Sequence, residues 1–127
     1  MSDLRNPLAR ARGLGSAKEG TVHWVAQRVS ALALIPLTLW FVYSMLIVMH
    51  GSYEQAYLWM HAPLVAVLLV ILIGTVFYHA YLGLQVVIED YVHGGWSKHG
   101  ALLIIKFLCV LLALSGIFAV LRIAFGG

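Results

Sequence analysis

One histidine lies deep inside a long stretch of uncharged residues. His79 is about ten residues from the nearer end of that stretch, and therefore about 15 Å inside it if the segment is helical. An ionisable group at this depth in an apolar helix needs a partner, and it usually marks a pathway or a cofactor. Two uses of the imidazole remain open: a hydrogen bond to a neighbouring helix, or axial ligation of haem iron, for which imidazole is well suited.

A glycine and an acid–tyrosine pair follow this histidine. Gly83 comes one turn later, about 40° around the helix, where the missing side chain lets a flat group or another helix approach the backbone. Asp90 lies within about 20° of His79 in angle and about 16 Å along the axis, and Tyr91 follows directly. A phenol can donate a hydrogen bond to a quinone carbonyl. The same pair is also typical of an interfacial aromatic belt with solvated acids.

A further group of polar residues opens the first apolar stretch, in the sequence His23-Trp24-x-x-Gln27-Arg28-x-Ser30. The Arg28 guanidinium could clamp a carboxylate, such as a haem propionate, through two hydrogen bonds. It could equally anchor a lipid phosphate. We expect Ser30 to form a hydrogen bond with the backbone of its own helix.

The segments that carry these residues are long and apolar. The chain has 127 residues, of which 62% are hydrophobic and 10% charged, whereas soluble domains average about 25% charged residues. Three uncharged or nearly uncharged stretches can each cross a hydrocarbon core about 30 Å thick, and lipid requires such spans to be helical. These spans cover about 29–49, 62–88 and 101–125. We therefore predict an all-α membrane protein, with a basic segment over 1–28 and a three-helix anchor domain over 29–127.

The distribution of Lys and Arg predicts how the helices cross the membrane. The first loop, 50–61, has neither residue type, whereas the second loop, 89–100, contains Lys98. Four of the eight basic residues lie in the first twenty residues, namely Arg5, Arg10, Arg12 and Lys18. The positive-inside rule then places the amino terminus in the cytoplasm and the carboxyl terminus in the periplasm. The basic tail is interpreted as a topology signal, and no nucleic-acid partner is expected.

These motifs together resemble the smaller hydrophobic membrane-anchor subunits of succinate dehydrogenase, respiratory complex II, of the proteobacterial type. The resemblance rests on His79-x-x-x-Gly83, Asp90-Tyr91 and Gln27-Arg28-x-Ser30-Ala31, and it covers nearly the whole chain. It implies a multi-pass protein of the bacterial inner membrane that packs with a second three-helix membrane anchor subunit and shares one haem b with it. It also implies docking of the iron–sulfur subunit and the FAD-containing flavoprotein subunit on the cytoplasmic face.

The resemblance also implies roles for individual residues. His79 matches the axial ligand of the haem iron, and Gly83 and Arg28 match positions near the haem. Tyr91 and Asp90 match positions in the ubiquinone site. We expect no catalytic residue in this chain alone, because nothing in it could oxidise a substrate unaided. Two alternatives remain open: an anchor of a related quinol:fumarate reductase, and a structural or assembly membrane protein without a cofactor.

Overall fold

The computed structural model describes residues 6–13 and 18–126, and this part of the chain is built of α-helices. Three of them, α2, α4 and α5, are long and apolar enough to cross a membrane, which confirms the predicted all-α chain with three spans. Arg5 of the predicted topology signal lies outside the described residues, as do the side chains of Arg10 and Lys18. The helices are α1 (Pro7–Ala11), α2 (Lys18–His50), α3 (Tyr53–His61), α4 (Pro63–Tyr91) and α5 (Gly95–Gly126).

The long helices extend beyond the predicted apolar spans. Helix α2 begins eleven residues before the predicted start of the first span, and its 33 residues measure about 50 Å at 1.5 Å per residue. That length exceeds a hydrocarbon core of about 30 Å. The helices also continue into the segment 89–100 between the second and third predicted spans, since only residues 92–94 separate α4 from α5. A charged residue ends an apolar stretch of the sequence, but the α-helix itself can continue past that residue into the water beside the membrane.

The carboxyl end of α4 is capped by the segment that follows it. The N–H of Val92 donates to the Ile88 carbonyl at 3.0 Å, and the Lys98 ammonium donates to the Glu89 carbonyl at 3.1 Å. The last carbonyls of a helix lack intrahelical partners and carry a partial negative charge, so a cation is stabilising there. Asp90 and Tyr91 are therefore the last two residues of a capped helix.

A short helix, α3, lies in the segment predicted as the first loop. Its capping box is complete: the Ser52 hydroxyl accepts from the Gln55 N–H at 3.3 Å, and the Gln55 side chain accepts from the Ser52 N–H at 3.1 Å. Trp59 of α3 stacks on Trp40 of α2, with ring centroids 6.2 Å apart. The segment is thus an ordered connection that packs back on the first span.

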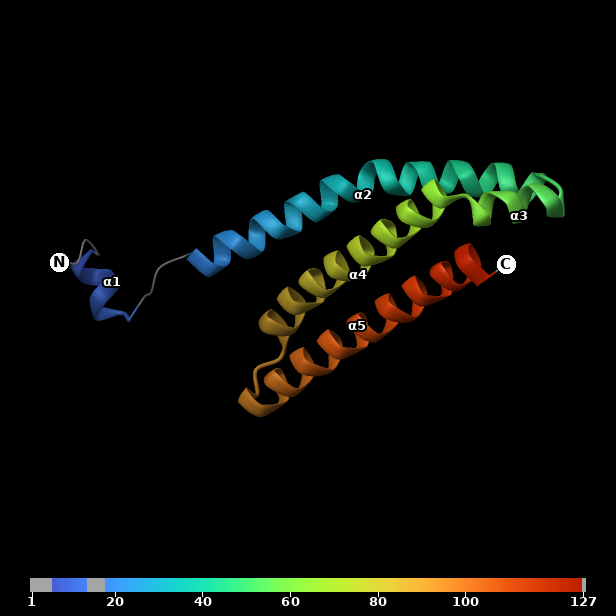
Figure 1. Cartoon of the computed structure of the whole chain (residues 1–127). Helices are drawn as coiled ribbons and strands as arrows, with labels where there is room; N and C mark the ends of the chain where they lie inside the picture. Colours follow the sequence, from blue (N-terminus) through green and yellow to red (C-terminus); the bar gives the residue numbers. More distant parts are fainter. Residues whose placement is uncertain (1–5, 14–17, 127) are drawn as a thin grey trace.

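Helix α4 lies between α2 and α5 and contacts both (Figure 1). Over the described residues, α2 and α5 do not touch one another. Gly116 allows the close approach of α5, because a Cβ atom there would lie 3.3 Å from the Ile73 side chain. The few buried apolar side chains all belong to α4: Val65, Ala66, Leu72 and Leu82. Most large apolar side chains of α2 and α5 are exposed, and lipid or another membrane chain suits such surfaces.

Candidate functional site

The His79 imidazole forms a hydrogen bond with a residue of the neighbouring helix α2. Its Nδ1 lies 2.9 Å from the Ser30 hydroxyl oxygen, and Ser30 is only 5% exposed. The Ser30 hydroxyl also donates to the Gln27 carbonyl at 3.0 Å, which confirms the predicted bond to its own helix. A hydrogen bond between His79 and a neighbouring helix was one of the two uses predicted for the imidazole, but Ser30 was not identified as the partner. Three other histidines bond through Nδ1 to the carbonyl four residues earlier on their own helix, namely His50, His61 and His99.

Gly83 faces α2 one turn beyond His79. A Cβ atom at this position would meet the Gln27 side-chain nitrogen at 3.6 Å, an ordinary van der Waals contact. Nothing in the described part of the chain therefore requires glycine here, although glycine costs about 0.5–1 kcal/mol relative to alanine within a helix. Nearby on α2, Gln27 Oε1 and His23 Nε2 are buried without a hydrogen-bond partner in the described structure. Buried polar groups need partners, so groups outside the described structure are needed to complete this end of the α2–α4 interface.

Tyr91 and Asp90 lie exposed at the carboxyl end of α4, with Tyr91 79% exposed. The Arg28 side chain is also exposed, and its guanidinium lies over the Trp24 ring, 5.4 Å from the centroid, as in a cation–π contact. No ion pair joins Arg28 to Asp90 among the described residues. The fold places the three predicted residues at the same end of α2 and α4 without bringing them into direct contact.

The described residues do not form a complete set of ligands for a bare metal ion. In the described ranges, no three His, Cys, Asp or Glu side chains gather into a metal-binding group. An iron atom bound by His79 must therefore take its other ligands from elsewhere. A haem meets this requirement, because its macrocycle supplies four nitrogen ligands and a second chain can supply the other axial one.

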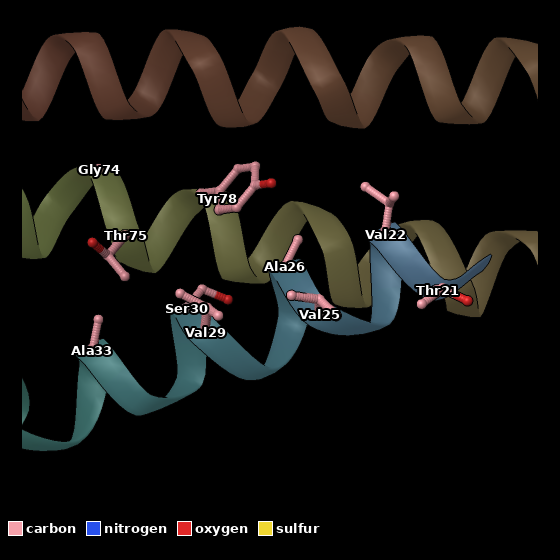
Figure 2. Close-up of a pocket in the computed structure, with 10 residues that line it drawn as sticks. All are labelled: Thr21, Val22, Val25, Ala26, Val29, Ser30, Ala33, Gly74, Thr75 and Tyr78. Atoms are coloured by element: carbon pink, nitrogen blue, oxygen red, sulfur yellow. The ribbon is translucent and has the colours of Figure 1, made fainter. Parts of the chain in front are cut away.

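An open groove of about 750 Å³ lies between α2 and α4, and its lining includes Gly74, Thr75 and Tyr78 of α4 and Ser30 of α2. Figure 2 shows the small side chains of α2 pointing toward α4 along this groove. Gly74 is nine residues before Gly83, so the two face about 180° apart on the helix. Thr75, however, is four residues before His79 and only about 40° from it around the helix, so the groove adjoins the His79–Gly83 surface, and Ser30 belongs to both.

The chain is similar to known proteins over most of its length. Residues 2–119 match the family model described as succinate dehydrogenase/fumarate reductase transmembrane subunit. A succinate dehydrogenase hydrophobic membrane anchor subunit of Rickettsia bellii is 33% identical over 118 residues, which cover 93% of this chain and 94% of the relative. The protein of the same description from Paracoccus denitrificans is 34% identical over 122 residues, covering 94% and 92%. No solved structure matches.

The match therefore includes the parts of α2, α4 and α5 described above, as well as the predicted site residues. A hydrophobic anchor with three apolar helices is a multi-pass protein of the bacterial inner membrane. The chain belongs to the family of succinate dehydrogenase/fumarate reductase transmembrane subunits.

Proposed function

We propose that the chain is the membrane anchor of a succinate:ubiquinone oxidoreductase, in which it helps bind haem b and form the ubiquinone-reduction site. The chemistry of one imidazole carries the proposal: Nδ1 of His79 is hydrogen-bonded to Ser30, which leaves the other ring nitrogen for a ligand. The two relatives described above, which match this chain over more than nine-tenths of their length, are named succinate dehydrogenase anchor subunits. The family model also includes fumarate reductase, and the potentials of the cofactors and the quinone determine the direction.

The proposed orientation follows the positive charges. Arg28 lies in the amino-terminal half of α2, and Lys98 lies near the start of α5 beside the end of α4. The segment between α2 and α4 carries no Lys or Arg. With the amino terminus in the cytoplasm and the carboxyl terminus in the periplasm, Asp90 and Tyr91 face the cytoplasm.

The proposed haem contacts are His79 as axial ligand, Gly83 beneath the macrocycle and Arg28 near a propionate. Haem b, when bound, supplies a one-electron carrier whose potential depends on its axial ligands. The residues fit such a group. His79 supplies one imidazole, Gly83 brings no side chain of its own to the same side of α4, where the Gln27 side chain is the nearest group, and the exposed Arg28 guanidinium can pair with a carboxylate.

The proposed quinone contacts are Tyr91 and Asp90. The phenol hydroxyl donates to a quinone carbonyl, and the adjacent carboxylate orients that hydroxyl or a nearby cation. Because these residues end α4, about 16–18 Å along the axis from His79, a quinone bound there lies near the membrane surface. Protons for quinone reduction then come directly from the cytoplasm.

The proposed partners cover surfaces that this chain leaves open. A second three-helix membrane anchor subunit packs against the exposed apolar helices and supplies the second haem ligand. The iron–sulfur subunit docks on the cytoplasmic ends, with the flavoprotein subunit beyond it. The basic and acidic residues Arg28, Asp90 and Lys98 lie at those ends.

Purification tests this assembly. The tagged chain, extracted in mild detergent, is expected to bring with it a flavoprotein, an iron–sulfur protein and a second small apolar protein, together with succinate–ubiquinone reductase activity. Protein identification, flavin and iron content, and the assay measure the result, with membranes from an untagged strain as the control. Recovery of the chain without flavin, from membranes that retain succinate oxidation, would contradict the proposed assembly.

Replacing Gly83 tests whether a group outside the chain lies against α4. Gly83→Ala leaves the fold of this chain intact, because the added Cβ makes only an ordinary contact. We expect haem affinity to fall about tenfold, since overpacking costs on the order of 1–3 kcal/mol. Gly74→Ala is the matched control, because that glycine also has space for a Cβ atom but faces the opposite side. Equal haem content in both variants would remove Gly83 from the proposed haem surface.

A further inference from the structure

The hydrogen bonds around Ser30 determine which nitrogen of His79 carries the proton. A serine hydroxyl has one proton to donate, and a backbone carbonyl can only accept. The Ser30 hydroxyl lies 3.0 Å from the Gln27 carbonyl oxygen and 2.9 Å from His79 Nδ1. Both contacts are hydrogen bonds at the same time only if the hydroxyl donates to the carbonyl and Nδ1 carries a proton that it donates to Ser30. This assignment follows from the bonding network, and it leaves Nε2 unprotonated.

The partner of His79 also fixes the direction of the ring. Where His50, His61 and His99 bond to the carbonyl four residues earlier, the orientation of the ring is set by its own helix. The ring of His79 is held by a side chain of α2, and that side chain is itself anchored to the α2 backbone. Ser30 is 5% exposed, so neither water nor lipid competes freely for this bond.

We infer that Ser30 is a positioning residue for the metal-binding nitrogen of His79. It holds the imidazole in the tautomer whose Nε2 lone pair is free, and it accepts the Nδ1 proton so that the ring becomes a stronger electron donor. This inference rests on the proposed role of His79 as a haem ligand. A residue of α2 thereby determines the tautomer and the electron-donor strength of a ligand that belongs to α4.

The test compares Ser30→Ala with Ser30→Thr in the purified complex. Alanine removes the acceptor, so the imidazole donates less electron density and stabilises the oxidised iron less. The haem midpoint potential is expected to rise. If the substitution weakens the binding of His79 to the oxidised iron tenfold more than its binding to the reduced iron, the rise is about 59 mV for a one-electron couple. The electron paramagnetic resonance spectrum of the oxidised haem is expected to shift as well. Threonine keeps the hydroxyl and is expected to restore both values.

Flavin content normalises the amount of assembled complex. If Ser30→Ala does not assemble, Ser30→Cys replaces it, because cysteine has a similar size and is a weak acceptor; the same rise in potential is expected. An unchanged potential and spectrum in a haem-containing variant without the hydroxyl would overturn the role of Ser30. Failure of the underlying proposal gives a different result, in which His79→Ala itself leaves the haem spectrum unchanged.

Discussion

Replacement of His79 by alanine is expected to reduce haem content on the order of tenfold or more. Even the loss of groups that only orient a metal ligand costs about 10–100-fold in affinity, and this substitution removes a ligand itself. The measurement is a dithionite-reduced minus oxidised spectrum of the purified complex, normalised to flavin. His99→Ala is the matched control, because that imidazole is exposed and bonds only to its own helix in the described structure.

The alternative role for His79 predicts a different spectrum. If the imidazole serves only to join α4 to Ser30 on α2, its removal lowers the stability of the chain by about 0.5–1.5 kcal/mol and leaves any b-type bands unchanged. If the b-type bands keep their full height in His79→Ala, the haem ligands are residues other than His79. An anchor purified with all its partner subunits but without b-type bands would favour the structural alternative.

Replacement of Tyr91 by phenylalanine is expected to slow ubiquinone reduction about tenfold. The substitution removes one hydroxyl from an exposed residue at the end of α4, so the helix and its cap are unaffected. The loss corresponds to one hydrogen bond of about 1–1.5 kcal/mol. Succinate-dependent reduction of ubiquinone is measured beside reduction of an artificial acceptor that takes electrons before the membrane, and only the first rate is expected to fall.

A second tyrosine provides the control for this experiment. Tyr53 is 85% exposed and lies at the start of α3, at the opposite end of the long helices from Tyr91. Tyr53→Phe is expected to change neither rate. A loss of both activities in Tyr91→Phe would indicate defective assembly, and unchanged ubiquinone reduction would remove Tyr91 from the quinone site.

The number and nature of the spans could be predicted from the sequence, because hydropathy over about twenty residues is a strong signal. The ends of the helices could not be predicted in this way, because hydropathy falls at the first charged residue whether or not the helix ends there. Hydropathy alone ends the second span at 88, although α4 continues to Tyr91, as the helical spacing of His79, Asp90 and Tyr91 assumed. Hydropathy also misses helix α3, but its capping box, Ser52 to Gln55, is visible in the sequence as S-x-x-Q and could have revealed it.

The bond between Ser30 and His79 follows from the way α2 and α4 are joined. Ser30 lies twenty residues before the end of α2, and His79 lies sixteen residues after the start of α4. Because the two helices run antiparallel from the connection between these ends, similar distances bring the two residues close to the same level. Counting from the predicted start of the first span at 29 instead puts Ser30 at the mouth of that span, which hides the pairing.

The rest of the site could not be predicted from one chain, because its proposed cofactor and partner subunits lie outside it. The buried apolar core comprises four side chains of α4, and Gln27 and His23 have buried polar atoms without partners in the described structure. The sequence identifies His79, Gly83, Arg28, Asp90 and Tyr91 by type and spacing. Their proposed ligands belong to the assembled complex.

A density map of that complex, obtained by electron cryomicroscopy, tests the central claim most directly. We predict continuous density from Nε2 of His79 to an iron at the centre of a flat macrocycle, with Nδ1 bonded to Ser30. A map in which Nε2 instead bonds to a side chain or water, with no macrocycle beside Gly83, would contradict the account.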